Sequence, residues 1–144
     1  MTAVLDAFAV LALLKGETAA NQVRGLIEDR GATMTTVGVA EVIDHLVRIV
    51  RVTDEDAALD LAQLELADPE PLDAELALRS GLLRALHYHR RTRAVSLADC
   101  VAAETARALG IPVATSDPHL LDLCRDTGID VIPLPDTHGS VWGP

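Results

Sequence analysis

Aromatic side chains are almost absent from this chain of 144 residues, which has only Phe8, Tyr88 and Trp142. The core must therefore be built from Ala, Leu, Val and Ile, and this composition suits helices packed closely on a sheet. A chain of this length fits one domain that buries an ordinary core without disulfides or a structural metal.

Cysteine and long apolar runs are also scarce. Cys100 and Cys124 have no ligand-like spacing, so we expect free, partly buried thiols in a reducing cytoplasm. No run of about 18 uncharged apolar residues occurs, so we expect no membrane span. The N-terminus leads directly into an apolar strand, which is not typical of a signal peptide. The predicted location is the cytoplasm.

Positive charge is limited, because Lys15 is the only lysine and the formal net charge is -10. This argues against the simplest kind of nucleic-acid binder, which carries an excess of Lys and Arg. It does not exclude a nucleic-acid enzyme, since a cation bound among carboxylates reverses the local field. Arginine supplies nearly all of the positive charge, and its guanidinium suits the geometry of phosphate oxygens better than a lysine ammonium does.

Hydrophobic periodicity predicts strands and helices in alternation. Strands are expected at 3–5, 33–36, 111–115 and 131–134, with a further short one at 64–66. Helices are expected at 7–14, 19–29, 37–50, 53–61, 72–89 and 97–109, and one more after Asp117. Pro133 indicates that the last strand is at a sheet edge. In the helix at 72–89 we expect Leu76, Leu83 and Leu86 to face inward.

The alternation predicts parallel βαβ units and a three-layer α/β/α sandwich around a central, mostly parallel sheet. We expect a single domain over residues 1–135 and a loose, polar tail over 136–144.

The stretch from Ser96 to Asp117 is the most informative part of the sequence. Ser96 is a good helix N-cap, and Asp99 falls in the first turn, where a carboxylate suits the helix dipole. Gly110 ends this helix before a short buried strand. Asp117 then caps another helix that has proline at its first position. In an open parallel sheet such strand-to-helix junctions share one edge, where ligands bind.

Two more carboxylates are expected at that edge. Asp6 follows the first strand, and Glu41 lies about one turn into the helix after the second strand. Four uncompensated carboxylates would raise one another's pKa values, and hard cations such as Mg²⁺ or Mn²⁺ would relieve the repulsion. One or two such ions can activate water for phosphodiester cleavage. The chain has 22 acidic residues, so each acid taken singly is also explained as a helix cap or a solvated side chain.

Four segments together resemble a PIN domain, most closely the VapC-type toxins of bacterial toxin–antitoxin pairs. They are VLD at 4–6, VAEV at 39–42, SLAD at 96–99 and VATSD at 113–117. The resemblance covers nearly the whole chain, in order. The sequence departs from the common pattern in two ways: its acidity is marked, and Val37-Gly38 stands ahead of Glu41 where many relatives carry polar residues.

The resemblance implies a catalytic and metal-binding cluster of Asp6, Glu41, Asp99 and Asp117, with Thr115 orienting the site by hydrogen bonding. It implies an endoribonuclease dependent on Mg²⁺ or Mn²⁺, with an RNA substrate. It also implies a cognate antitoxin as partner and a homodimer.

Arg90, Arg91 and Arg93 are the best candidates for RNA phosphate contacts, although a charge run is usually a solvated face. Two other functions remain open. A non-catalytic module of the same fold would bind a partner protein through apolar helical faces. A phosphatase with Asp6 as nucleophile is less favoured. Such sites usually contain a second Asp two residues after the nucleophile, and this chain has Phe8 at that position.

Overall fold

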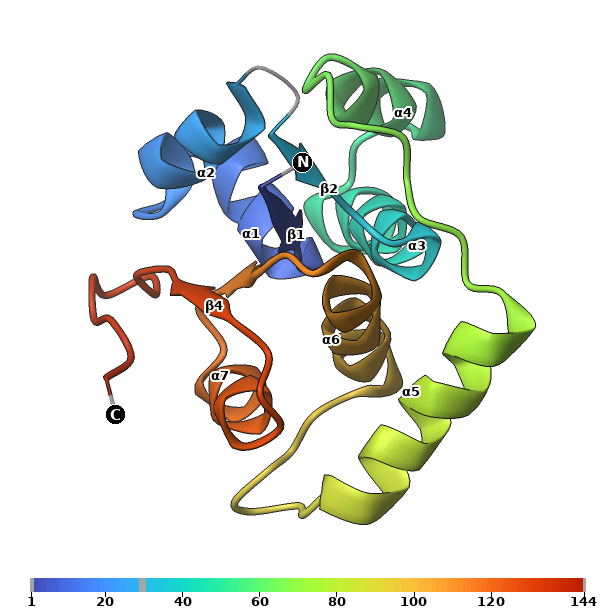
Figure 1. Ribbon diagram of the computed structural model, residues 1–144. Helices are drawn as coiled ribbons and strands as arrows, with labels where there is room; N and C mark the ends of the chain where they lie inside the picture. The colour runs from blue at the N-terminus through green and yellow to red at the C-terminus, as the bar shows by residue number, and fades with distance from the viewer. Residues whose placement is uncertain (1, 29–30, 144) are drawn as a thin grey trace.

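The computed structural model describes residues 2–28 and 31–143, and these residues form a central sheet of four parallel strands (Figure 1). The strands are β1 (Ala3–Leu5), β2 (Ala32–Thr33), β3 (Val113–Thr115) and β4 (Val131–Pro133). They lie in the order β2-β1-β3-β4, so the prediction of an edge position for the proline-containing strand is confirmed. The strand predicted at 33–36 is found at Ala32–Thr33 instead, because Thr35 caps α3 and Thr36 begins it, and the strand predicted at 111–115 is confined to Val113–Thr115.

Seven α-helices occur among these described residues, together with one π-helical turn. The helices are α1 (Ala7–Leu14), α2 (Ala20–Ile27), α3 (Thr36–His45), α4 (Asp54–Ala62), α5 (Ala74–His87), α6 (Leu97–Leu109) and α7 (Pro118–Asp126). The predicted helix at 37–50 is divided, because the π-helical turn η2 (Leu46–Val50) continues α3 and ends at Arg51 with φ 72°. The predicted helix at 19–29 ends at Ile27, and Asp29 lies outside the described residues.

Side chains of the central strands alternate between two hydrophobic clusters, as the period of two in a strand requires. Leu5 and Ala114 join a cluster with α1, α2 and α3, whereas Val4 and Val113 join another with α6 and α7. Helices therefore cover both faces of the sheet, and the predicted three-layer α/β/α sandwich is confirmed.

The strand predicted at 64–66 is wrong. Glu65 has φ 55°, a left-handed conformation that breaks an extended strand. The chain instead runs beside β2 a few residues later, where Ala67 N donates to Ala32 O at 3.0 Å and Glu70 N donates to Met34 O at 2.9 Å.

The inward prediction for Leu86 is also wrong. Leu83 is buried as expected, but Leu86 is 77% exposed. The outer face of α5 thus carries an apolar side chain that the fold leaves in water.

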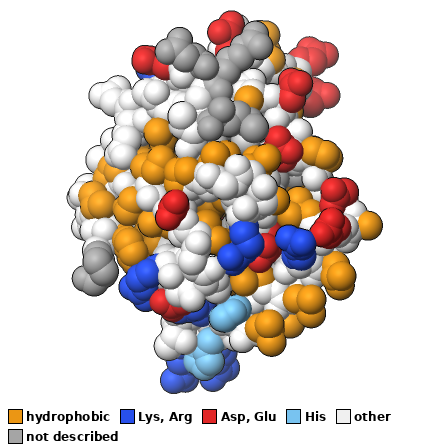
Figure 2. Space-filling model, in the orientation of Figure 1, with side chains coloured by type: hydrophobic (Ala, Val, Ile, Leu, Met, Phe, Trp, Pro, Cys, Tyr) orange, Lys and Arg blue, Asp and Glu red, His pale blue; other side chains and the backbone are white. Residues whose placement is uncertain are grey.

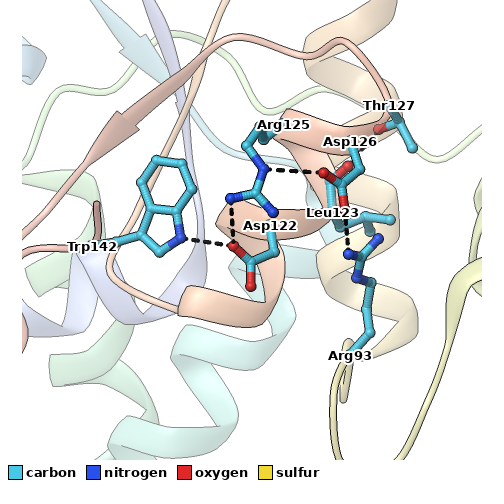
Figure 3. A network of polar contacts seen from close by, with 7 residues as sticks. All are labelled: Arg93, Asp122, Leu123, Arg125, Asp126, Thr127 and Trp142. Carbon is cyan, nitrogen blue, oxygen red and sulfur yellow. Dashed lines mark hydrogen bonds and ion pairs between the residues drawn. The ribbon is translucent and has the colours of Figure 1, made fainter. Parts of the chain in front are cut away.

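The C-terminal segment makes specific contacts although it has no helix or strand in its described part, 134–143. Asp136 Oδ1 accepts from the backbone N–H groups of His138 and Ser140, each at 2.9 Å. Trp142 Nε1 donates to Asp122 Oδ1 of α7 at 2.9 Å (Figure 3). No helix in the described part of the chain is long and apolar enough to cross a membrane.

Candidate carboxylate site

The connections out of β1 define a switch point in the sheet. The next strand in the chain, β2, lies on one side of β1, while β3 lies on the other side and is followed outward by β4. In open parallel sheets this arrangement leaves a crevice at the carboxyl ends of the two central strands, where ligands bind. Asp6 directly follows β1, and Thr115 is the last residue of β3. The two residues therefore stand at this crevice.

Hydrogen bonds fix Asp6 at the end of β1. As the N-cap of α1, its Oδ1 accepts from Ala9 N at 2.8 Å, and its Oδ2 accepts from the buried hydroxyl of Thr115. Thr115 Oγ1 in turn accepts from Asp117 N at 3.0 Å. Asp6 is only 6% exposed. One threonine hydroxyl thus joins the Asp6 side chain to the backbone at Asp117, and a role for Thr115 in orienting a metal site stays a prediction.

Asp99 and Asp117 each cap a helix with one carboxylate oxygen. Ser96 and Asp99 form a reciprocal capping box, with Ser96 N donating to Asp99 Oδ2 at 2.9 Å and Asp99 N donating to Ser96 Oγ at 3.0 Å. Asp117 Oδ1 accepts from His119 N at 2.9 Å at the start of α7. The second carboxylate oxygen of Asp99 and that of Asp117 accept no hydrogen bond from any of the described residues. These oxygens are therefore free to accept a ligand.

The carboxyl groups act on one another electrostatically. The pKa of Asp6 is raised to about 7, mainly by burial; the hydrogen bonds from Thr115 and Ala9 oppose this rise, and the charges of Asp99 and Asp117 add to it. Burial also raises the pKa of Asp99, with an added contribution from the charge of Asp117. The pKa of Glu41 is raised by burial and then by the charge of Asp99. The charge of Asp117 thus acts on Asp6 and Asp99, and the charge of Asp99 acts on Asp6 and Glu41.

The four acids fit a hard divalent cation by chemistry, because they supply only oxygen donors and cluster where their charges repel. The side chains as they lie do not yet form a cage: in the described part of the chain, no three His, Cys, Asp or Glu side chains converge to hold a metal ion. Glu41 is exposed on α3, which packs against α6, so its side chain has room to rotate. Closing a cation site requires side-chain movement of this kind.

The three arginines expected at RNA phosphates differ in their surroundings. Arg93 forms an ion pair with Asp126 of α7, and its side chain is only 18% exposed (Figure 3). Arg90 and Arg91 are exposed in the turn between α5 and α6, where His89 Nδ1 accepts from Arg91 N at 3.2 Å. Sequence reasoning missed the ion pair of Arg93, because nothing local connects it to a residue on another helix.

Fold and site together define an α/β/α protein with acidic residues near the carboxyl ends of the two central strands of a parallel sheet. The PIN domain family model matches residues 3–126, which is most of the chain. The protein therefore belongs to the PIN domain family, and the family predicted from the four acidic segments is confirmed.

Solved structures with the same fold are distant in sequence. The chain superposes on one from VapBC2 of Rickettsia felis bound to a DNA fragment from its promoter, with a TM-score of 0.68, 15% identity and coverage of 93% of this chain and 99% of that one. For VapC20 of Mycobacterium tuberculosis, a Sarcin-Ricin loop cleaving toxin, the TM-score is 0.67 at 16% identity, with coverage of 89% and 96%.

DNA-bound VapBC from Salmonella typhimurium gives a TM-score of 0.67 at 18% identity, with coverage of 92% and 98%. No curated protein matches the chain by sequence. At these identities the likeness concerns the fold.

Proposed function

We propose that this protein is an endoribonuclease dependent on Mg²⁺ or Mn²⁺ and the toxin of a toxin–antitoxin pair. The observation that carries the proposal is the clustering of Asp6, Asp99 and Asp117 at the β1/β3 switch point, where burial and mutual charge raise the pKa values of Asp6 and Asp99. Such perturbed acids in a crevice are typical of a functional site.

The cation would be held by Asp6, Asp99 and Asp117, with Glu41 closing the site from α3. When bound, Mg²⁺ or Mn²⁺ polarises a phosphoryl oxygen and activates water for attack on phosphorus. The fold contributes preorganisation of the donors. The Thr115 hydroxyl holds Asp6, and the capping box holds Asp99, so each carboxylate keeps its orientation before substrate arrives.

RNA must approach a chain with a formal net charge of -10. Neutralisation of the carboxylates by a cation removes the strongest local repulsion from the crevice. Phosphate contact by Arg90 and Arg91 stays a prediction, whereas the Arg93 guanidinium is already held by Asp126.

The antitoxin partner is supported by the identity of the structural neighbours. Two of the solved structures with this fold are VapBC assemblies, and another is a toxin–antitoxin complex from Klebsiella pneumoniae. We expect a second, small protein that binds this chain and blocks access of RNA to the crevice.

Cleavage of end-labelled RNA by the purified chain, with and without added Mn²⁺, tests the proposal. Asp99→Asn removes the charge, while the amide oxygen can still accept from Ser96 N, so folding is preserved and cleavage is lost. Asp44→Asn is the matched control, since Asp44 is not one of the four acids and forms an exposed ion pair with Arg48, with an N···O distance of 2.9 Å. Equal cleavage by the wild-type and Asp99→Asn proteins would overturn the nuclease assignment.

A non-catalytic module of the same fold is the second candidate, and one observation favours it: the acids of the described residues do not yet converge on a common point. Calorimetric titration with Mn²⁺ separates the two functions. A nuclease takes up Mn²⁺ in the wild type and loses that uptake in Asp99→Asn, whereas an interaction module shows no uptake that depends on the carboxylates.

A further inference from the structure

Phe8 is an aromatic side chain that the fold leaves largely in water. It lies in the first turn of α1, two residues after Asp6, and is 62% exposed. The other two aromatic side chains, Tyr88 and Trp142, each lie beside an arginine guanidinium, at 4.3 Å and 5.6 Å from the ring centroid. In the described part of the chain, no cation lies over the Phe8 ring. One face of this ring is therefore open to a ligand.

A groove of about 320 Å³ lies beside Phe8. One of its walls is a face of α1 that carries Phe8 and, two turns later, Lys15. The other wall is the chain after β4, at 134–137. Thr18, in the turn after α1, donates through Oγ1 to Thr137 O at 3.3 Å. Two segments that are far apart in the sequence thus form one groove and are joined by a hydrogen bond.

The groove reaches the residues of the carboxylate site. Ser116 lines the groove and stands between Thr115 and Asp117 in the chain. At the other wall, Asp6 caps the helical turn that carries Phe8. In a nucleic-acid strand, one sugar separates each base from the phosphates on either side of it. A strand with a phosphate at the acids would therefore bring a neighbouring base to the groove.

The charge of the groove favours a neutral ligand over a phosphate. Glu17 and Asp136 line it with negative charge, and Lys15 is the only basic residue of the described chain that lines it. The Lys15 ammonium lies 4.0 Å from Glu17 Oε1, so its charge is partly balanced. Figure 2 shows Lys, Arg and His side chains gathered toward the bottom of the molecule, where Figure 1 places the turn between α5 and α6, away from α1. A nucleobase is flat and uncharged, and it stacks on aromatic side chains.

We propose that this groove holds an unpaired RNA base next to the scissile phosphate, with the base stacked on the ring of Phe8. The inference rests on the proposed function, because it takes a phosphate of the same strand to lie at the four acids. Every base has a π-face, so stacking on Phe8 selects single-stranded RNA over duplex RNA rather than one base over another. The substrate is thus a loop or an unpaired segment whose bases are free to leave the stack.

Substitutions at Phe8 test the stacking through the KM and kcat for an end-labelled single-stranded RNA. Phe8→Leu keeps an apolar side chain but removes the ring, so it should raise the KM about 10-fold and leave kcat nearly unchanged. Phe8→Trp should restore a KM as low as that of the wild type. Leu59→Ala is the control for loss of an exposed apolar side chain, because Leu59 is 53% exposed on α4, and its KM should not change.

These variants should fold, because Phe8 makes few contacts in the core, and equal melting temperatures would verify it. The same KM for Phe8→Leu and the wild type would overturn the proposal. A rise in KM for Phe8→Leu that Phe8→Trp does not reverse would also overturn it, because a stacking platform accepts any aromatic ring.

Tryptophan fluorescence reports base stacking without requiring cleavage. Phe8→Trp places an indole at the groove, and Asp99→Asn alone, in which Trp142 is the only tryptophan, gives the background signal. Both proteins carry Asp99→Asn so that the RNA stays intact. Octaadenylate should quench the added signal, whereas a ribose-phosphate strand of the same length without bases should leave it unchanged. Equal quenching by the two strands, or none by either, would refute a stacked base.

The two measurements separate failure of this inference from failure of the proposed function. Cleavage that depends on Asp99 but not on Phe8 keeps the nuclease and refutes the groove as a base site. If octaadenylate quenches the fluorescence at position 8 while no cleavage depends on Asp99, the nuclease is refuted and the groove is supported as a site for an RNA base.

Lys15→Gln distinguishes a base in the groove from a phosphate. A phosphate held by Lys15 would make the KM rise in the variant and would lower the salt dependence of binding by about one charge. A base needs no cation, so we expect the KM of Lys15→Gln to stay within about twofold of the wild type, with the same salt dependence. A rise in KM as large as that of Phe8→Leu, with a smaller salt dependence, would show a phosphate there and overturn the proposal.

Discussion

Thr115 Oγ1 donates a hydrogen bond to Asp6 Oδ2, joining two buried side chains that are 109 residues apart in the sequence. The contact connects the carboxyl ends of the two central strands, β1 and β3. The same hydroxyl accepts from Asp117 N at 3.0 Å. A single threonine therefore couples the two carboxylate-bearing junctions of the sheet, and its removal should disturb both.

Thr115→Val keeps the shape of the side chain but removes both hydrogen bonds. A buried carboxylate that loses a donor costs about 1–3 kcal/mol, so we expect the free energy of unfolding to fall by about that amount at pH 8. Thr105→Val is the control, because the Thr105 hydroxyl is buried and has no hydrogen-bond partner among the described residues. Urea unfolding of both variants provides the comparison, and equal losses would contradict a special role for Thr115.

The raised pKa of Asp6 makes the stability of the metal-free protein depend on pH. The folded state holds the proton up to about pH 7, whereas the unfolded chain releases it near about pH 4. Stability therefore falls as pH rises from about 4 to about 7 and changes little from this group above that window. The loss for the wild type is on the order of 4 kcal/mol at most.

Asp6→Asn removes this titration, while its amide oxygen can still accept from Ala9 N. In the presence of EDTA, the unfolding free energy of the wild type should fall between pH 5 and pH 8 relative to that of Asp6→Asn. Chemical denaturation at the two pH values measures it. A difference that does not change with pH would show that Asp6 titrates normally in the folded protein.

Some features of the fold and of the carboxylate site could be predicted from the sequence, and others could not. Asp6 and Asp117 were predictable as neighbours, because each follows a buried strand of a parallel sheet and such junctions share one edge. Glu41 was expected near them from its position one turn into the helix after the second strand; it is exposed on α3, and its pKa is raised by burial and then by the charge of Asp99. The sequence did not predict that the acids stop short of a common point, since side-chain rotamers depend on the packing around them.

Other features escaped prediction for identifiable reasons. The alternating apolar residues at 64–66 favour a strand, but the left-handed conformation of Glu65 depends on tertiary packing. On α5, leucines occur on two sides of the helix, so periodicity could not decide that Leu83 is buried and Leu86 exposed. The contacts of Arg93 with Asp126 and of Trp142 with Asp122 join distant segments, and no local pattern reveals them.

Added cations should stabilise the protein in a pH-dependent manner. A cation that binds only the folded state raises the melting temperature, and protons compete with it for carboxylates such as Asp6, whose pKa is about 7. We therefore expect Mn²⁺ to raise the melting temperature clearly at pH 8 and much less at pH 5. Asp99→Asn should remove most of the effect at pH 8. A rise of equal size in wild type and variant would place Mn²⁺ elsewhere on this acidic surface.

Two substitutions at Asp117 separate its structural role from its chemical one. Asp117 Oδ1 caps α7 by accepting from His119 N, and asparagine caps a helix about as well as aspartate. Asp117→Asn should therefore keep the melting temperature while RNA cleavage falls, since only the charge is lost. Asp117→Ala loses the cap as well and should cost about 1 kcal/mol of stability in addition. Melting curves and cleavage rates for both variants provide the measurement. If Asp117→Asn cleaves RNA as well as the wild type, Asp117 is a helix cap and takes no part in the chemistry.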